Sequence, residues 1–162
     1  MRSRYLWSII FFFLLLLFQT TILPIIAIKG VVPDLILILL VFYSMQLGQL
    51  SGTVLGFVYG FFFDVITGSL LGTTMLSLTI VGFVAGYFSN ENKRDLYFNN
   101  YLFVLIVAMC SIINSAFNSF FASIDLNTSV VRLLLNQGIF PTLYTALISV
   151  LVVVFYPKRS FD

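Results

Sequence analysis

The 162-residue sequence has no histidine, only one cysteine and few charges. Without histidine it lacks the commonest general base and the commonest transition-metal ligand. The single Cys110 cannot form a disulfide within the chain, and its apolar surroundings favour a small packing residue. Only 9% of the residues are charged, the net charge is +2 and no Lys/Arg run is present. This composition argues against nucleic-acid binding.

Apolar residues dominate what is present. They make up 60% of the chain, which includes 19 Phe, and the mean hydropathy is +1.10. A water-soluble monomer is excluded because too little polar surface is available to cover it. At about 20 residues per membrane-spanning helix, the chain has room for roughly six spans and no large catalytic domain outside the membrane. The predicted fold class is therefore an all-α integral membrane bundle.

The apolar segments predict one polytopic membrane domain over residues 1–162. Its spans are expected at 5–28, 33–47, 50–66, 70–88, 101–124 and 137–156. Pro33 suits the first turn of the second span, where its missing N–H costs nothing. The second and third segments are short for a complete crossing, so tilted helices and a membrane-buried hairpin both stay open.

Basic residues predict the orientation, because they are retained on the cytoplasmic side of a membrane. With the N-terminus inside, the cytoplasmic ends carry six of them: Arg2, Arg4, Lys93, Arg94, Lys158 and Arg159. The outer side carries Lys29 and Arg132. Both termini are therefore expected in the cytoplasm.

A four-residue ladder of small residues runs through the third span and the turn after it. Its glycines are Gly52, Gly56, Gly60, Gly68 and Gly72, and the ladder position between Gly60 and Gly68 is Asp64. In lipid, small residues on one helix face let another backbone approach closely, and this contact drives association. The approaching helix belongs either to this chain or to a partner, and both readings stay open.

Two carboxylates, Asp34 and Asp64, lie within the predicted spans, and both are expected at the outer edge of the hydrocarbon, where charge costs less. Three uses compete: a structural role, a partner contact, and catalysis or proton transfer. In the structural role the carboxylates pair with Lys29 or accept hydrogen bonds from span-end N–H groups. An aspartyl protease is disfavoured, because Phe-Phe-Phe-Asp-Val-Ile around Asp64 lacks a GxGD-type element.

A polar stripe marks the fifth span. Its members, at helical offsets 0, 3, 4 and 7, are Ser111, Asn114, Ser115 and Asn118. Such residues commonly hydrogen-bond across helices, and Thr73 and Ser77 are one plausible match on the fourth span. A substrate-lining or partner-facing surface is the alternative. No P-loop, metal cluster or nucleophile–base pair is present, so no cofactor, no metal and no enzymatic activity are expected.

These residues resemble a known family, the rod shape-determining MreD proteins. The likeness rests on the run Pro33-Asp34-Leu35-Ile36-Leu37, the spacing of Gly52, Gly56 and Gly60 before Asp64, and the pair Gly68 and Gly72. The resemblance implies a multi-pass protein of the bacterial inner membrane that serves as a non-enzymatic scaffold for cell elongation, peptidoglycan synthesis and cell shape. Carried over by position, Pro33, Asp34, Gly52, Gly56, Gly60, Asp64, Gly68 and Gly72 are family motif residues and candidate partner contacts.

The resemblance also implies partners. These are membrane lipid, an MreC-like single-span protein and, through it, a RodA-type synthase, its transpeptidase and MreB filaments; a homo-oligomer stays open. The family's fold is thought similar to the substrate-binding subunits of energy-coupling-factor transporters. The alternative function is accordingly a vitamin-capturing transporter subunit, although the scattered alanines of this chain do not form the alanine-rich face expected of one.

Overall fold

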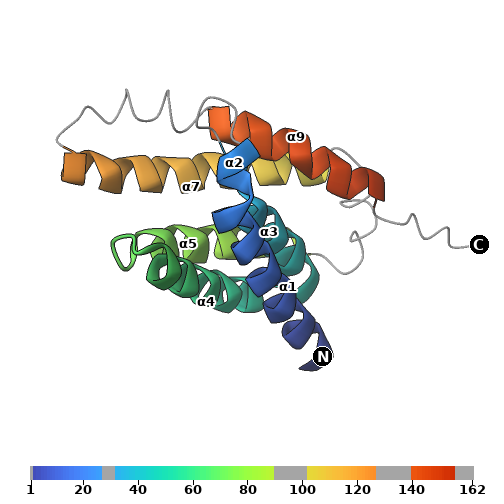
Figure 1. Cartoon of the computed structure of the whole chain (residues 1–162). Helices are drawn as coiled ribbons and strands as arrows, with labels where there is room; N and C mark the ends of the chain where they lie inside the picture. The colour runs from blue at the N-terminus through green and yellow to red at the C-terminus, as the bar shows by residue number, and fades with distance from the viewer. Residues whose placement is uncertain (1, 27–31, 90–101, 127–139, 156–162) are drawn as a thin grey trace, which may run out of the picture.

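A computed structural model describes residues 2–26, 32–89, 102–126 and 140–155, and they form helices and short turns (Figure 1). The helices are α1 (Arg2–Thr21), α2 (Leu23–Ile26), α3 (Leu35–Leu47), α4 (Gln49–Thr67), α5 (Thr73–Tyr87), α7 (Leu102–Leu126) and α9 (Phe140–Phe155). The all-helical prediction is confirmed. Among the described residues, two helical segments are long and apolar enough to cross a membrane by length and composition, Gln49–Thr67 and Leu102–Phe121.

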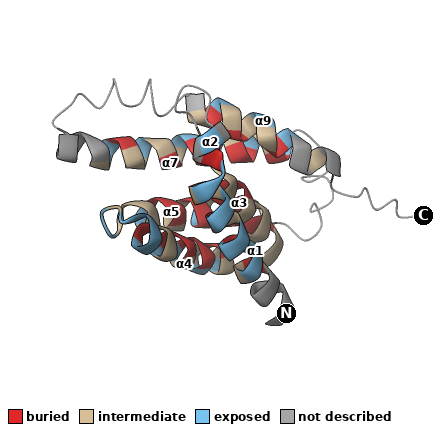
Figure 2. Ribbon diagram, viewed as in Figure 1, coloured by how far each residue is buried: buried red, intermediate tan, exposed pale blue. Residues whose placement is uncertain are grey.

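The short α3 is the central helix of the bundle. It contacts α1, α4, α5, α7 and α9, while α4 pairs with α5 and α7 pairs with α9. Its residues Ile36, Leu37, Leu40 and Val41 are almost fully buried, and Figure 2 shows buried positions on the inward sides of the surrounding helices. A helix that is apolar all round is suited to this central place. The core therefore forms around a helix of only 13 residues.

Two differences from the predicted spans lie at prolines. The first span was expected to continue from 5 to 28, but α1 ends at Thr21 and α2 begins after a turn at Ile22. Pro24 has no N–H, and its ring would clash with the carbonyl four residues earlier, so it interrupts the helix. Pro33 also lies outside a first turn, because α3 begins at Leu35 with Asp34 as its N-cap.

Aromatic packing fixes α1 against α4. The ring of Phe12 stacks on that of Tyr59 with centroids 4.2 Å apart. The Tyr59 hydroxyl donates a hydrogen bond to the backbone carbonyl of Ser8 at 3.0 Å. Both rings are fully buried, so α1 is held on the bundle along this side.

The glycine face of α4 lies against α5. A Cβ built on Gly52 would lie 2.5 Å from the carbonyl oxygen of Gly82, and one on Gly60 would lie 2.7 Å from the backbone nitrogen of Met75. Gly56 meets the carbonyl group of Leu78 in the same way. The ladder therefore packs within the chain, and α5 occupies the face that a partner helix would need. The hypothesis that Gly52, Gly56 and Gly60 contact a partner is thus not supported.

The last two glycines of the ladder have a different role. Gly68 ends α4 with φ +68°, and Gly72 precedes α5 with φ +106°. A Cβ on either would meet nothing within 4 Å. Their backbone conformation, which side chains disfavour, explains why glycine occurs at these two turn positions.

Candidate functional site

Asp64 closes the turn between α4 and α5. Its carboxylate accepts hydrogen bonds from the backbone nitrogens of Gly72 at 2.9 Å, Met75 at 3.2 Å and Thr74 at 3.3 Å. The Ser69 hydroxyl donates a fourth at 2.8 Å. These N–H groups belong to the start of α5, where no helical partner exists for them. Asp64 is 1% exposed and acts as a structural acceptor.

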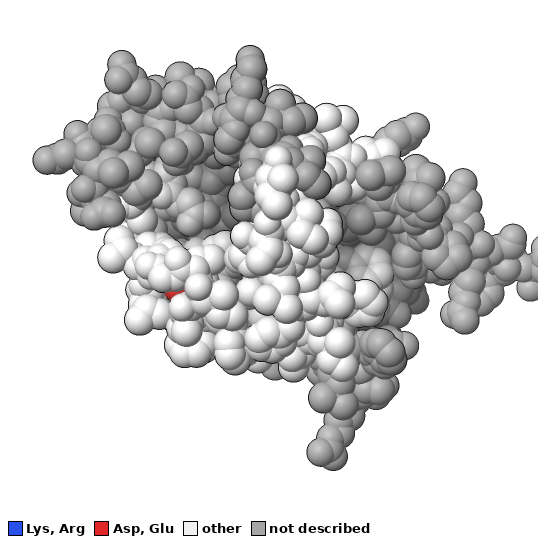
Figure 3. Space-filling view, viewed as in Figure 1, with Lys and Arg blue, Asp and Glu red and all other residues white. Residues whose placement is uncertain are grey.

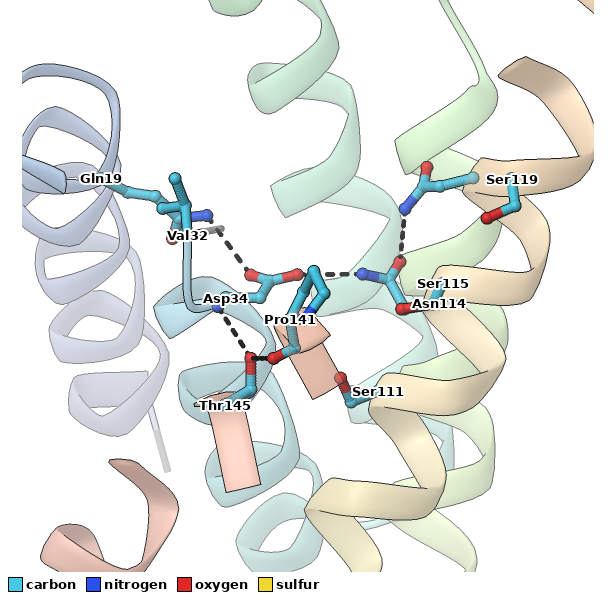
Figure 4. A pocket seen from close by; sticks show the side chains of 10 residues that line it. Gln19, Val32, Asp34, Ser111, Asn114, Ser115, Ser119, Pro141 and Thr145 are labelled. Atoms are coloured by element: carbon cyan, nitrogen blue, oxygen red, sulfur yellow. Dashed lines mark hydrogen bonds between the residues drawn. The ribbon is translucent and has the colours of Figure 1, made fainter. Parts of the chain in front are cut away.

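Asp34 joins four helices. Its Oδ1 accepts from the backbone nitrogen of Leu37 at 3.0 Å and from Gln19 Nε2 at 3.5 Å, and its Oδ2 accepts from Asn114 Nδ2 at 2.9 Å. Its own backbone N–H donates to Thr145 Oγ1 at 3.0 Å. Figure 4 shows the carboxylate between Gln19 of α1 and Asn114 of α7.

The partners of Asp34 lie at different levels of their helices. Asn114 is midway along the 25-residue α7, about 18 Å from its first residue at 1.5 Å rise per residue. Gln19 and Thr145 lie near helix ends, two residues before the end of α1 and five residues after the start of α9. The expected place of Asp34 at the outer edge of the hydrocarbon stays a prediction.

The polar stripe of α7 bonds to neighbouring helices on two sides. On one side Ser77 Oγ of α5 donates to Asn114 Oδ1 at 2.7 Å. Within α7, Asn118 Nδ2 donates to the same oxygen at 3.2 Å. On the other side the hydroxyls of Ser111 and Ser115 lie 3.3 Å and 3.4 Å from Thr142 Oγ1 of α9. The suggested match with Ser77 is confirmed.

The suggested match with Thr73 is wrong. Its hydroxyl donates to the carbonyl oxygen of Leu70 within the turn before α5. Thr73 starts that helix, whereas Ser77 lies one turn further along it and reaches the level of Asn114.

We expect the Ser77–Asn114 bond to contribute measurably to stability. In a double-mutant cycle with Ser77→Ala and Asn114→Ala, the coupling energy should be about 0.6 kcal/mol and at most about 2 kcal/mol, as for other hydrogen bonds between membrane helices. The same cycle with Thr73→Ala in place of Ser77→Ala should give a coupling near zero. Thermal unfolding in detergent measures both cycles. Equal coupling in the two would contradict the assignment.

A polar cavity of about 200 Å³ opens beside Asp34 (Figure 4). It is lined by Gln19, Val32, Asp34, Ser111, Asn114, Ser115, Asn118, Ser119, Pro141 and Thr145. A second cavity of about 190 Å³ shares Asp34, Asn114 and Asn118 with the first. Sequence reasoning missed Gln19, Thr142 and Thr145. Gln19 is a polar residue within an apolar span, and this was one available signal. The helical spacing of Thr142, Thr145 and Ser149, which are buried on α9, was another.

A separate apolar groove of about 400 Å³ lies between α1, α3 and α9. We call it the α1/α3/α9 groove. Its lining residues are Phe11, Leu15, Leu35, Ile38, Leu39, Phe42, Tyr43 and Ile148. In contrast to the glycine face, no described helix of the chain fills it.

The arrangement offers little for catalysis. In the part of the chain that the structure describes, Asp34 and Asp64 share no hydrogen-bond partner, whereas paired catalytic carboxylates share a proton. Within the described ranges, no group of three His, Cys, Asp or Glu residues could hold a metal ion. Lys29 and Arg132, considered as outer-side charges, lie outside the described residues.

Comparison with known proteins gives one match. The family described as rod shape-determining protein MreD matches residues 1–158. Neither the curated proteins nor the solved structures yield a match. The likeness to transporter subunits accordingly stays an expectation. The matched range includes Asp34, Asp64, both polar cavities and the α1/α3/α9 groove.

Proposed function

Since the chain belongs to the MreD family, we propose that it acts in cell elongation by docking a single-span, MreC-like protein in the α1/α3/α9 groove. MreD proteins are non-catalytic, multi-pass proteins of the inner membrane that determine rod shape within the elongation machinery. Through the docked protein, the chain would be linked to a RodA-type synthase, its transpeptidase and MreB. Family membership places the chain in cell elongation and so favours this role over the vitamin-transporter alternative.

The groove is the observation that supports this docking site. The small-residue face of α4 is already covered by α5, so it has no room for a further helix. The α1/α3/α9 groove is concave, apolar and bordered by two helices that both contact α3. Association in lipid depends on van der Waals packing, and a concave surface provides more of it than a convex one. A partner helix seated in the groove therefore gains more contact than one on a convex face.

The remaining described surface is suited to lipid. On the face shown in Figure 3 it is almost entirely uncharged. Side chains that point outward on the helices that border the groove include Leu14 on α1 and Leu147 on α9, which are 63% and 69% exposed. Each is next in sequence to a groove residue, Leu15 or Ile148, and so provides a matched control.

The experiment is site-directed crosslinking in native membranes, with Cys110 first replaced by alanine. Single cysteines at Leu15 and Ile148 are expected to crosslink to cysteines in the span of the MreC-like protein. Cysteines at Leu14 and Leu147 are expected to give little product. Crosslinks confined to the Leu14 and Leu147 positions, or none at any of the four, would contradict the proposed docking site.

A further inference from the structure

The apolar groove and the polar cavity are lined by different residues of neighbouring turns on α1 and α9. On α1, Leu15 lines the groove and Gln19, one turn further along, lines the cavity. On α9, Ile148 lines the groove, and Thr145, about one turn before it, lines the cavity. Asp34 of the cavity immediately precedes Leu35 of the groove. A helix lying in the groove would therefore extend past the cavity and bring one of its side chains to the level of Asp34.

The cavity has a negative group and no positive one among the described residues. The donors to the Asp34 carboxylate in that part of the chain are all neutral: the N–H of Leu37, the amide of Gln19 and the amide of Asn114. Such donors stabilise a carboxylate only partly, and charges within a membrane are typically paired. The adjacent 200 Å³ has room for a further group that would donate hydrogen bonds to this carboxylate.

We infer that this cavity receives a basic side chain, Lys or Arg, carried by the transmembrane helix docked in the α1/α3/α9 groove. The inference rests on the docking proposed above and adds its charge specificity. Apolar side chains of the partner fill the groove, and its ammonium or guanidinium group donates hydrogen bonds to Asp34. The hydroxyl groups of Ser111 and Ser115 provide a polar lining around it.

Other occupants fit the cavity less well. Calcium takes six to eight oxygen ligands, commonly with several carboxylates, and Asp34 is the single carboxylate among the described residues of the lining. An anionic lipid headgroup would be repelled by Asp34. A small amine would satisfy the charge but would leave the adjoining apolar groove unfilled. A basic residue on an apolar helix satisfies both features.

A charge-moving pair of variants tests the inference. Asp34→Asn removes the negative charge, and the double variant Asp34→Asn/Asn114→Asp returns it on the opposite side of the same hydrogen bond. In the double variant the side chain at 34 still accepts from Leu37 and Gln19 and donates to position 114. The new carboxylate at 114 still accepts from Ser77 and Asn118. The hydrogen-bond network is thus kept while the charge moves.

The measurement is the amount of co-expressed MreC-like protein that co-purifies with the full chain, normalised to folded chain by size-exclusion chromatography. Asp34→Asn should lower the apparent affinity by about thirtyfold or more, which is typical when a buried charge pair loses one member. The double variant should recover most of this loss. Each basic residue of the partner's span is also replaced with glutamine. One of these substitutions should lower the affinity as much as Asp34→Asn does, and combining it with Asp34→Asn should cause no further loss.

Ile148→Trp, which fills the groove, separates this inference from the docking proposal. If Ile148→Trp abolishes capture of the MreC-like protein while Asp34→Asn captures it like wild type, the docking site stands. The inference of a basic side chain at Asp34 is then overturned. If neither variant changes capture, both are overturned. The inference is also overturned if the folded double variant fails as Asp34→Asn does. If Asp34→Asn does not fold, the glutamine substitutions in the partner's span test the inference instead. Unchanged capture with all of them overturns it.

Discussion

Gly56→Leu should prevent α4 from packing on α5 and remove most of the folded protein. The Cβ alone would overlap the carbonyl oxygen of Leu78 and lie 2.7 Å from its carbonyl carbon. These are backbone atoms of a packed helix and cannot rotate away as a flexible side chain would. Overpacking commonly costs about 1–3 kcal/mol, and a backbone overlap should exceed this range. The measurement is the yield of monodisperse protein in size-exclusion chromatography of detergent extracts.

Val54→Leu is the matched control for this change. It adds bulk to the same helix, two residues away, on a side chain that is 56% exposed. Its yield and thermal stability should equal those of the wild type. A Gly56→Leu protein that folds as well as Val54→Leu but fails to bind the MreC-like partner would reverse the assignment and make this glycine face a partner surface.

Asp64→Leu should destabilise the bundle by about 3 kcal/mol or more, because each unpaired buried group costs about 1–3 kcal/mol. The substitution keeps the branching of the side chain at Cγ but leaves the N–H groups of Gly72, Thr74 and Met75 without their acceptor. For a chain of this size, about 2–4 °C per kcal/mol places the expected fall in Tm at about 6–12 °C. Thermal unfolding of the purified protein in detergent measures it.

Thr67→Val tests whether the loss comes from the Asp64 carboxylate itself. Thr67 lies at the same turn, but it is exposed, and its hydroxyl lies within hydrogen-bond distance of the carbonyl oxygen of Phe63 and of the hydroxyl of Ser69 but does not contact the Asp64 carboxylate. Its substitution should change the free energy of unfolding by less than about 0.5 kcal/mol. Equal losses in the two variants would mean that the turn is sensitive to any change. The carboxylate would then have no special role.

Much of the fold follows from local properties of the sequence. Hydropathy predicts a helical membrane protein, because a bilayer requires long apolar segments whose backbone groups are satisfied internally. The four-residue spacing of Gly52, Gly56 and Gly60 predicts close helix approach, and these residues do pack tightly. The motif around these glycines and Asp34 resembles MreD, and the family match over residues 1–158 confirms the resemblance.

The arrangement of those elements was decided by tertiary packing. Spacing along α4 cannot reveal which helix covers its glycines, since that depends on the complementary Gly82 and Gly86 of α5. Nor can it reveal which side chains meet Asp34, because these contacts depend on how the short α3 is seated against α1, α7 and α9.

The polar cavity illustrates the same division. Its stripe on α7 is visible as a pattern within a single helix, whereas Gln19 and Thr145 are isolated polar residues in other apolar segments. Thr145 meets the backbone of Asp34 across 111 positions of the chain. The membrane class, the helices, the family and the face along which α4 is closely approached all follow from local sequence patterns. Which residues meet depends on the tertiary structure, because contacts between helices depend on the three-dimensional fit of their surfaces.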